Sequence, residues 1–160
     1  MSTLSAFYSD PIDINILKGS FFIRNNPSIQ IISINDKRVT IDASSKYVFL
    51  YSDAHICVLV RSDIINNGRS VWELYDSYPF ADTRISQFID KSVQLANAAT
   101  STEIGARTQR DENSCIAYCT VYVHLRESAG LAHKEATSRL GTLPLITVRE
   151  TAFRILNVLE

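Results

Sequence analysis

The sequence predicts an α+β fold in which a mixed β-sheet is flanked by helices. Up to about residue 80, short β-branched and aromatic runs are separated by breaks rich in Asn, Asp and Ser, a pattern typical of strands and their turns. From Asp82 onward, apolar residues instead recur at helical spacing, and strands followed by helices favour an α+β architecture. With 160 residues, 46% of them hydrophobic, the chain is expected to form one domain, residues 1–160, with its own core.

The first expected element is a short helical turn through Leu17, because Asp10-Pro11 has the form of an N-cap followed by a first helical residue. Short strands are then predicted at residues 21–24, 29–34, 39–41 and 47–50. The apolar run that ends at Val60 and the run from Val71 to Asp76 predict two more strands. Because a polar break at residues 62–68 separates these two runs, we expect them to form a hairpin.

The helical part begins with an apolar stripe formed by Ile85, Phe88, Ile89, Val93 and Ala96. After a polar connection at residues 97–107, helices are expected over residues 114 to about 127 and over residues 131–140. Residues 147–150 have capping-box form, and the helix that follows has one apolar face, made of Val148, Ala152, Ile155, Leu156 and Leu159. Tyr118, Tyr122 and Val123 are expected in the core, and Trp72 either in the core or in the wall of a groove. His124 and His133 are expected on helix surfaces.

Charge and hydropathy exclude several classes of partner. The formal net charge is −1 and no run is rich in Lys or Arg, so we expect no nucleic-acid or anionic-membrane binding. We also expect no membrane span and no Sec signal, because long apolar stretches are missing. Three cysteines in apolar segments do not make a disulfide framework and suit a reducing compartment. A cytoplasmic location is therefore predicted, in a host cell if the source is a microbe or a virus.

Cys115 is the strongest candidate for a reactive residue. It stands where the polar stretch 109–114 becomes an apolar helix, and Asn113 or Ser114 can cap that helix. Free backbone N–H groups and the positive end of the helix dipole favour thiolate over thiol at such a position. A cysteine placed there can act as a nucleophile.

A base and its partner are predicted on the hairpin. His55 opens the strand that ends at Val60, and Asp76 closes the strand that begins at Val71. The start of one hairpin strand faces the end of the other, so both side chains are expected at the same edge of the sheet. An imidazole oriented by a carboxylate is the usual activator of a nucleophile.

The order His55, Asp76, Gln109, Cys115 resembles clan CE of the cysteine peptidases. This clan includes the SUMO and ubiquitin-like-protein proteases, the adenovirus maturation protease and the acetyltransferase effectors of bacterial pathogens. In it a histidine opens one strand, an aspartate closes the next, and a glutamine stands six residues before the nucleophile, as Gln109 does here. Glu73 would fit the family's shorter histidine-to-acid spacing, but strand alternation puts it on the face opposite Asp76.

The resemblance implies a papain-like architecture with the nucleophile at a helix N-terminus. By the same resemblance Cys115 is the nucleophile, His55 the general base, Asp76 its orienter and Gln109 an oxyanion donor. The implied activity is a thiol protease, similar to deubiquitinases and deSUMOylases, with no cofactor and no metal. Its substrates would be ubiquitin, a ubiquitin-like protein or a viral polyprotein.

Three alternatives stay open. The same residues suit an acetyltransferase in which acetyl-CoA loads Cys115. A binding module without turnover is the second alternative, because the chain has Ile56 and Ile116 where the family usually has tryptophan and glycine. The third is a zinc site formed by His55, Cys57, Cys115 and Cys119, although their spacing is not that of ordinary zinc modules.

Overall fold

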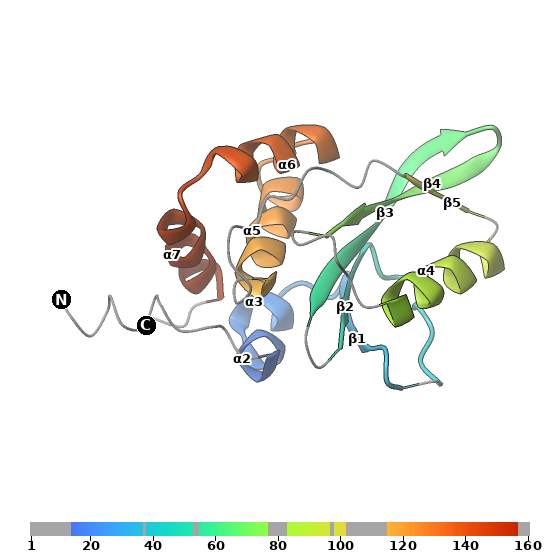
Figure 1. Ribbon diagram of the computed structural model, residues 1–160, viewed down its shortest axis with the longest axis horizontal. Helices are drawn as coiled ribbons and strands as arrows, with labels where there is room; N and C mark the ends of the chain where they lie inside the picture. The colour runs from blue at the N-terminus through green and yellow to red at the C-terminus, as the bar shows by residue number, and fades with distance from the viewer. Residues whose placement is uncertain are drawn as a thin grey trace.

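The computed structural model describes residues 14–36, 38–52, 55–76, 83–96, 98–101 and 115–156 (Figure 1). They form a mixed five-stranded sheet with the strand order β1-β2-β3-β4-β5. The strands are β1 (Ile29–Ser33), β2 (Tyr47–Tyr51), β3 (Ile56–Asn66), β4 (Arg69–Tyr75) and β5 (Ala99–Ser101). The pairs β2/β3 and β3/β4 are antiparallel, whereas β1/β2 and β4/β5 are parallel. The α+β prediction is confirmed at this level.

The described helices lie on both faces of the sheet. They are α2 (Ile14–Gly19), α3 (Phe21–Arg24), α4 (Thr83–Leu95), α5 (Cys115–Glu127), α6 (His133–Thr142) and α7 (Leu145–Leu156). Figure 1 shows α4 on one side of the sheet and α5, α6 and α7 on the other. None of the helices in the described segments is long and apolar enough to cross a membrane.

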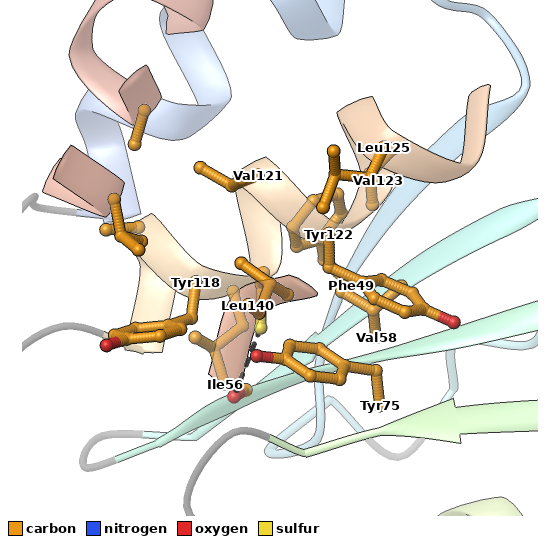
Figure 2. Packing of buried hydrophobic residues seen from close by; sticks show 14 of the residues in the cluster. Phe49, Ile56, Val58, Tyr75, Tyr118, Val121, Tyr122, Val123, Leu125 and Leu140 are labelled. Carbon is orange, nitrogen blue, oxygen red and sulfur yellow. Dashed lines mark hydrogen bonds between the residues drawn. The ribbon is translucent and has the colours of Figure 1, made fainter. Parts of the chain in front are cut away.

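The sheet separates two hydrophobic clusters, because successive side chains of a strand point to opposite faces. Toward α4, the cluster contains Leu59 and Trp72 of the sheet and Ile85 and Ile89 of the helix. Toward α5, the cluster is larger; its buried members include Tyr47, Phe49, Val58, Tyr75, Tyr118, Tyr122 and Val123. Figure 2 shows the side chains of α5 packed over the strands. The prediction that Tyr118, Tyr122 and Val123 are core residues is confirmed, and Trp72 lies in the core as well.

The β3/β4 hairpin is confirmed, and a tight turn sets its geometry. Asn67 (φ 53°) and Gly68 (φ 76°) both adopt positive φ, as the favoured two-residue hairpin turns require. A bulge between Arg61 and Ile65 shifts the register near the turn. Away from the turn, Val58 pairs with Tyr75, so the start of β3 lies beside the end of β4.

Some element predictions are wrong, and local hydrogen bonds explain two of them. Residues 21–24 form α3 and not a strand, because the Ser20 side chain accepts a hydrogen bond from the Ile23 N–H (3.3 Å) and caps the turn. α7 already begins at Leu145, where the Val148 N–H donates to the carbonyl of Pro144, so residues 147–150 lie inside the helix and do not cap it.

The remaining differences concern residues 39–41, which are not a strand, and residues 99–101, which form β5 inside the segment predicted as a connection. His133 is buried and not on the surface, because its Nδ1 hydrogen-bonds the Tyr122 hydroxyl at 2.8 Å. The predicted cap at Asp10-Pro11 lies outside the described residues.

Candidate active site

The hairpin brings His55 and Asp76 together, as the sequence predicted. His55 directly precedes β3 and Asp76 directly follows β4. His55 Nε2 lies 2.7 Å from Asp76 Oδ1, and the two side chains are only 10% and 4% exposed. In such a dry environment a charge-assisted hydrogen bond holds the imidazole ring firmly.

The backbone of His55 is held from the neighbouring strand. β2 and β3 pair up to Tyr51 and Ile56, and the Ser52 N–H donates to the His55 carbonyl at 2.8 Å. This hydrogen bond fixes the backbone of the histidine at the point where the chain enters β3. The position of the ring is therefore set by the sheet on both sides, through Ser52 and through Asp76.

Cys115 supplies the third group. It is the first residue of α5 and is partly exposed. Its side chain hydrogen-bonds His55. Because Nε2 of that ring contacts Asp76, Nδ1 is the nitrogen left for the sulfur. The imidazole thus lies between a carboxylate and a thiol.

This environment favours a charged imidazole. Burial alone would lower the pKa of His55, but hydrogen bonds from the ring to Asp76 and Cys115, with the negative charge of both groups, outweigh burial. The net effect raises the pKa of His55 from 6.5 to about 9. At neutral pH the ring can therefore carry a proton beside the sulfur, and an imidazolium stabilises a thiolate.

The other two cysteines lie in a different environment. Cys57 and Cys119 are fully buried, and burial raises the pKa of both thiols well above the usual value. The Cys119 thiol donates to the Ile56 carbonyl, with 3.7 Å between sulfur and oxygen; Figure 2 shows this contact as a dashed line. Of the three cysteines, only Cys115 combines partial exposure with a base.

The zinc alternative finds no support in the geometry. Cys57 belongs to the hydrophobic cluster facing α4, whereas Cys119 belongs to the one facing α5, so the sheet lies between them. Within the described segments, no group of three or more His, Cys, Asp or Glu side chains is placed to hold a metal ion.

Glu73, the alternative acid, has another partner. Its Oε1 accepts a hydrogen bond from Arg126 Nη2 of α5 at 2.8 Å. Arg126 Nη1 donates to the Tyr122 hydroxyl at 2.9 Å, and that hydroxyl hydrogen-bonds His133. Sequence reasoning missed this buried network. Its one local signal is the helical spacing of Tyr122 and Arg126, four residues apart.

Not every predicted residue can be placed. Gln109, the expected oxyanion donor, lies outside the described residues, as do the candidate caps Asn113 and Ser114. The structure thus brings together three of the four predicted catalytic residues: His55, Asp76 and Cys115.

Comparisons with known proteins give little beyond the geometry. No family model matches the chain, and no curated protein is similar to it. Eight chains among the solved structures do match. One is the central domain of the uncharacterized protein Lpg1148 from Legionella pneumophila, which has 13% identity and a TM-score of 0.46 over 81% of this chain and 88% of that chain. A similarity at this level says nothing about activity.

Proposed function

We propose that this chain is a cysteine peptidase of clan CE that cleaves amide or isopeptide bonds of ubiquitin, a ubiquitin-like protein or a viral polyprotein. The observation that carries the proposal is the 2.7 Å hydrogen bond between His55 and Asp76 beside the Cys115 thiol. Imidazole, carboxylate and thiol in this order are the machinery of thiol proteases. A helix that starts at the nucleophile and packs on the sheet is also what a papain-like architecture would have.

The reaction follows from the three groups. The Cys115 thiolate attacks the scissile carbonyl carbon, a carbon–sulfur bond forms, and the carbonyl electron pair moves to oxygen. Gln109 and the Cys115 backbone N–H would hold that oxyanion. The His55 imidazolium gives its proton to the leaving nitrogen as the carbon–nitrogen bond breaks. Water, deprotonated by His55, then hydrolyses the thioester and restores the starting pair.

Incubation with a panel of ubiquitin-like proteins that carry C-terminal electrophiles, read by intact mass, tests this proposal. We expect one probe to form a covalent adduct with the wild type. Cys57→Ala should form it too, because Cys57 is fully buried and burial raises the pKa of its thiol, whereas Cys115→Ala should not. A polyprotein-type peptide panel covers the viral substrate class.

The alternatives give different outcomes in the same experiment. A covalent acetyl group on Cys115 after incubation with acetyl-CoA, together with no probe adduct, would favour the acetyltransferase. Normal alkylation of Cys115 without any adduct or acetyl group would favour a binding module. Either result would overturn the peptidase proposal.

A further inference from the structure

A buried polar network joins β4, the strand that directly precedes Asp76, to α5, the helix that begins at Cys115. The Arg126 and Glu73 side chains are only 11% and 10% exposed, and their ion pair measures 2.8 Å. Beside this pair, the rings of Tyr75 and Tyr122 stack at 4.3 Å between centroids (Figure 2). Tyr75 directly precedes Asp76. The network therefore acts on the last residues of β4.

The position of Cys115 depends on how α5 lies on the sheet. α5 has 13 residues and is about 20 Å long, so a rotation or a shift at its C-terminal end is carried to its first residue. Most of its contacts are apolar, and apolar packing has little directional preference. Directional contacts are needed to fix the register of the helix against the hairpin.

Two such contacts tie α5 to the hairpin. Near the N-terminal end of the helix, Cys119 donates to the carbonyl of Ile56, the residue after His55. Near the C-terminal end, Arg126 binds Glu73, three residues before Asp76. One contact thus holds the strand of the base, and the other holds the strand of the acid.

A buried ion pair is a poor device for stability alone. Its desolvation cost is so large that replacing the pair by apolar side chains of similar volume is often neutral or stabilising. What the pair provides is a defined geometry. Since a misplacement of about 1 Å can cost on the order of a hundredfold in rate, geometry at this position matters for catalysis.

We propose that Arg126 and Glu73 are positioning residues, which set the distance between Cys115 and the His55–Asp76 pair by locking α5 against the end of β4. This inference rests on the proposed function for its effect on turnover. Its effect on the reactivity of Cys115 requires no substrate.

The double variant Glu73→Leu/Arg126→Met tests the proposal, because it removes the contact and leaves no buried charge. We expect it to fold with a melting temperature within a few degrees of the wild type. Its kcat should fall about tenfold or more while KM stays within about twofold, since alignment and not binding is lost. The rate of Cys115 alkylation at neutral pH should also fall, because the sulfur is no longer held beside the His55 ring.

Tyr47→Phe is the matched control at the same end of α5. The Tyr47 hydroxyl donates to Glu127 Oε2 at 2.6 Å, but it comes from β2, which carries none of the three reactive groups. We expect this variant to lose some thermal stability and to keep both kcat and the alkylation profile. Arg126→Lys, which retains the charge opposite Glu73, should recover part of the rate lost in the double variant.

Native kcat and alkylation in the folded double variant would overturn the proposal, as would an equal loss in Tyr47→Phe. If the double variant fails to fold, Glu73→Gln/Arg126→Gln replaces it, because it removes the ion pair, leaves no buried charge and keeps polar side chains at both positions; an unchanged alkylation profile there would also count against the proposal. A wild type that forms no adduct with any probe would overturn the proposed function, whereas the alkylation profiles would still decide this inference.

Discussion

His55 Nε2 and Asp76 Oδ1 lie 2.7 Å apart at the open end of the β3/β4 hairpin, opposite its turn, although 21 residues separate them in the chain. The Asp76 carboxylate binds Nε2 of the imidazole, which leaves Nδ1 for Cys115. Orientation and proton affinity of the base are therefore set by the same contact.

Turnover should decline as pH rises through about 9. The pKa of His55 is raised from 6.5 to about 9, so its proton is available to the leaving nitrogen up to that pH. A rate profile of kcat/KM measured from pH 5 to 10.5 checks this. In Asp76→Asn the alkaline limb should move to lower pH, because the negative charge opposite the ring is gone.

The same proton is linked to folding stability. A pKa that is higher in the folded than in the unfolded chain stabilises the fold fully below pH 6.5, and this contribution is lost as pH rises through about 9. The melting temperature of the wild type should therefore fall over this window more than that of His55→Gln. Parallel curves for the two proteins would contradict the link.

Cys115 should be the fastest of the three cysteines to react with iodoacetamide at neutral pH. Cys57 and Cys119 are fully buried, and burial raises the pKa of both thiols, so their thiolates are rare. Peptide mapping after a short exposure measures the three rates, and Cys115→Ala should abolish turnover. Faster labelling of either buried cysteine would refute the assignment.

Losses at the supporting residues should be graded. His55→Ala should be nearly as damaging as Cys115→Ala, because both proton transfers need the ring. Asp76→Asn should leave more activity, with a loss on the order of a hundredfold. Glu73→Gln should be milder, since its amide oxygen can still accept from Arg126, although the melting temperature should drop because the buried guanidinium loses its countercharge.

These variants also separate the two acids. If Glu73→Gln slowed turnover more than Asp76→Asn, Asp76 would not be the residue that orients His55. Steady-state kinetics on one substrate is sufficient for the comparison, provided that both variants give folded protein.

Gln109→Ala should reduce kcat by about a hundredfold, equivalent to about 2.7 kcal/mol, if the side chain donates to the oxyanion. KM should change little, because the oxyanion exists only in the transition state and the intermediate. Gln109→Glu, which puts a negative charge in the same place, should be worse. An effect confined to KM would point to substrate binding.

The purified protein should contain much less than one zinc per chain and keep its melting temperature in a chelator. Cys57 and Cys119 lie on opposite faces of the sheet, so the candidate ligands do not converge. Elemental analysis and thermal unfolding with and without EDTA check both points. Stoichiometric zinc, together with a sharp drop in melting temperature in EDTA, would support the structural zinc site.

The sequence could predict the His55–Asp76 pair because a hairpin is local. Its two strands read as apolar runs, its turn reads as a polar break, and strand alternation excludes Glu73 from the same face. The start of α5 could be predicted in the same way, since the polar stretch before Cys115 is followed by a continuous apolar run. Both features depend on neighbours in the chain.

Contacts between residues far apart in the chain could not be predicted from the sequence pattern. Nothing in the chain near Arg126 indicates that Glu73 is its partner, because the ion pair forms only when α5 packs on β4. The run at residues 21–24 has the composition of a strand, but local hydrogen bonds, among them the Ser20 cap, hold it as a helix. β5 has three small or polar residues and is a strand only because β4 offers it an edge.

The hairpin also bears on the order in which the protein folds. β2, β3 and β4 are consecutive antiparallel strands, and contacts of short sequence separation close at a small entropic cost. Cys115 comes from a helix much further along the chain, so we expect it to meet His55 only when α5 docks. A nascent or partly unfolded chain would then expose an ordinary thiol and become reactive only on reaching its final packing. Alkylation pulses during refolding would detect this as fast Cys115 labelling that appears with the last kinetic phase.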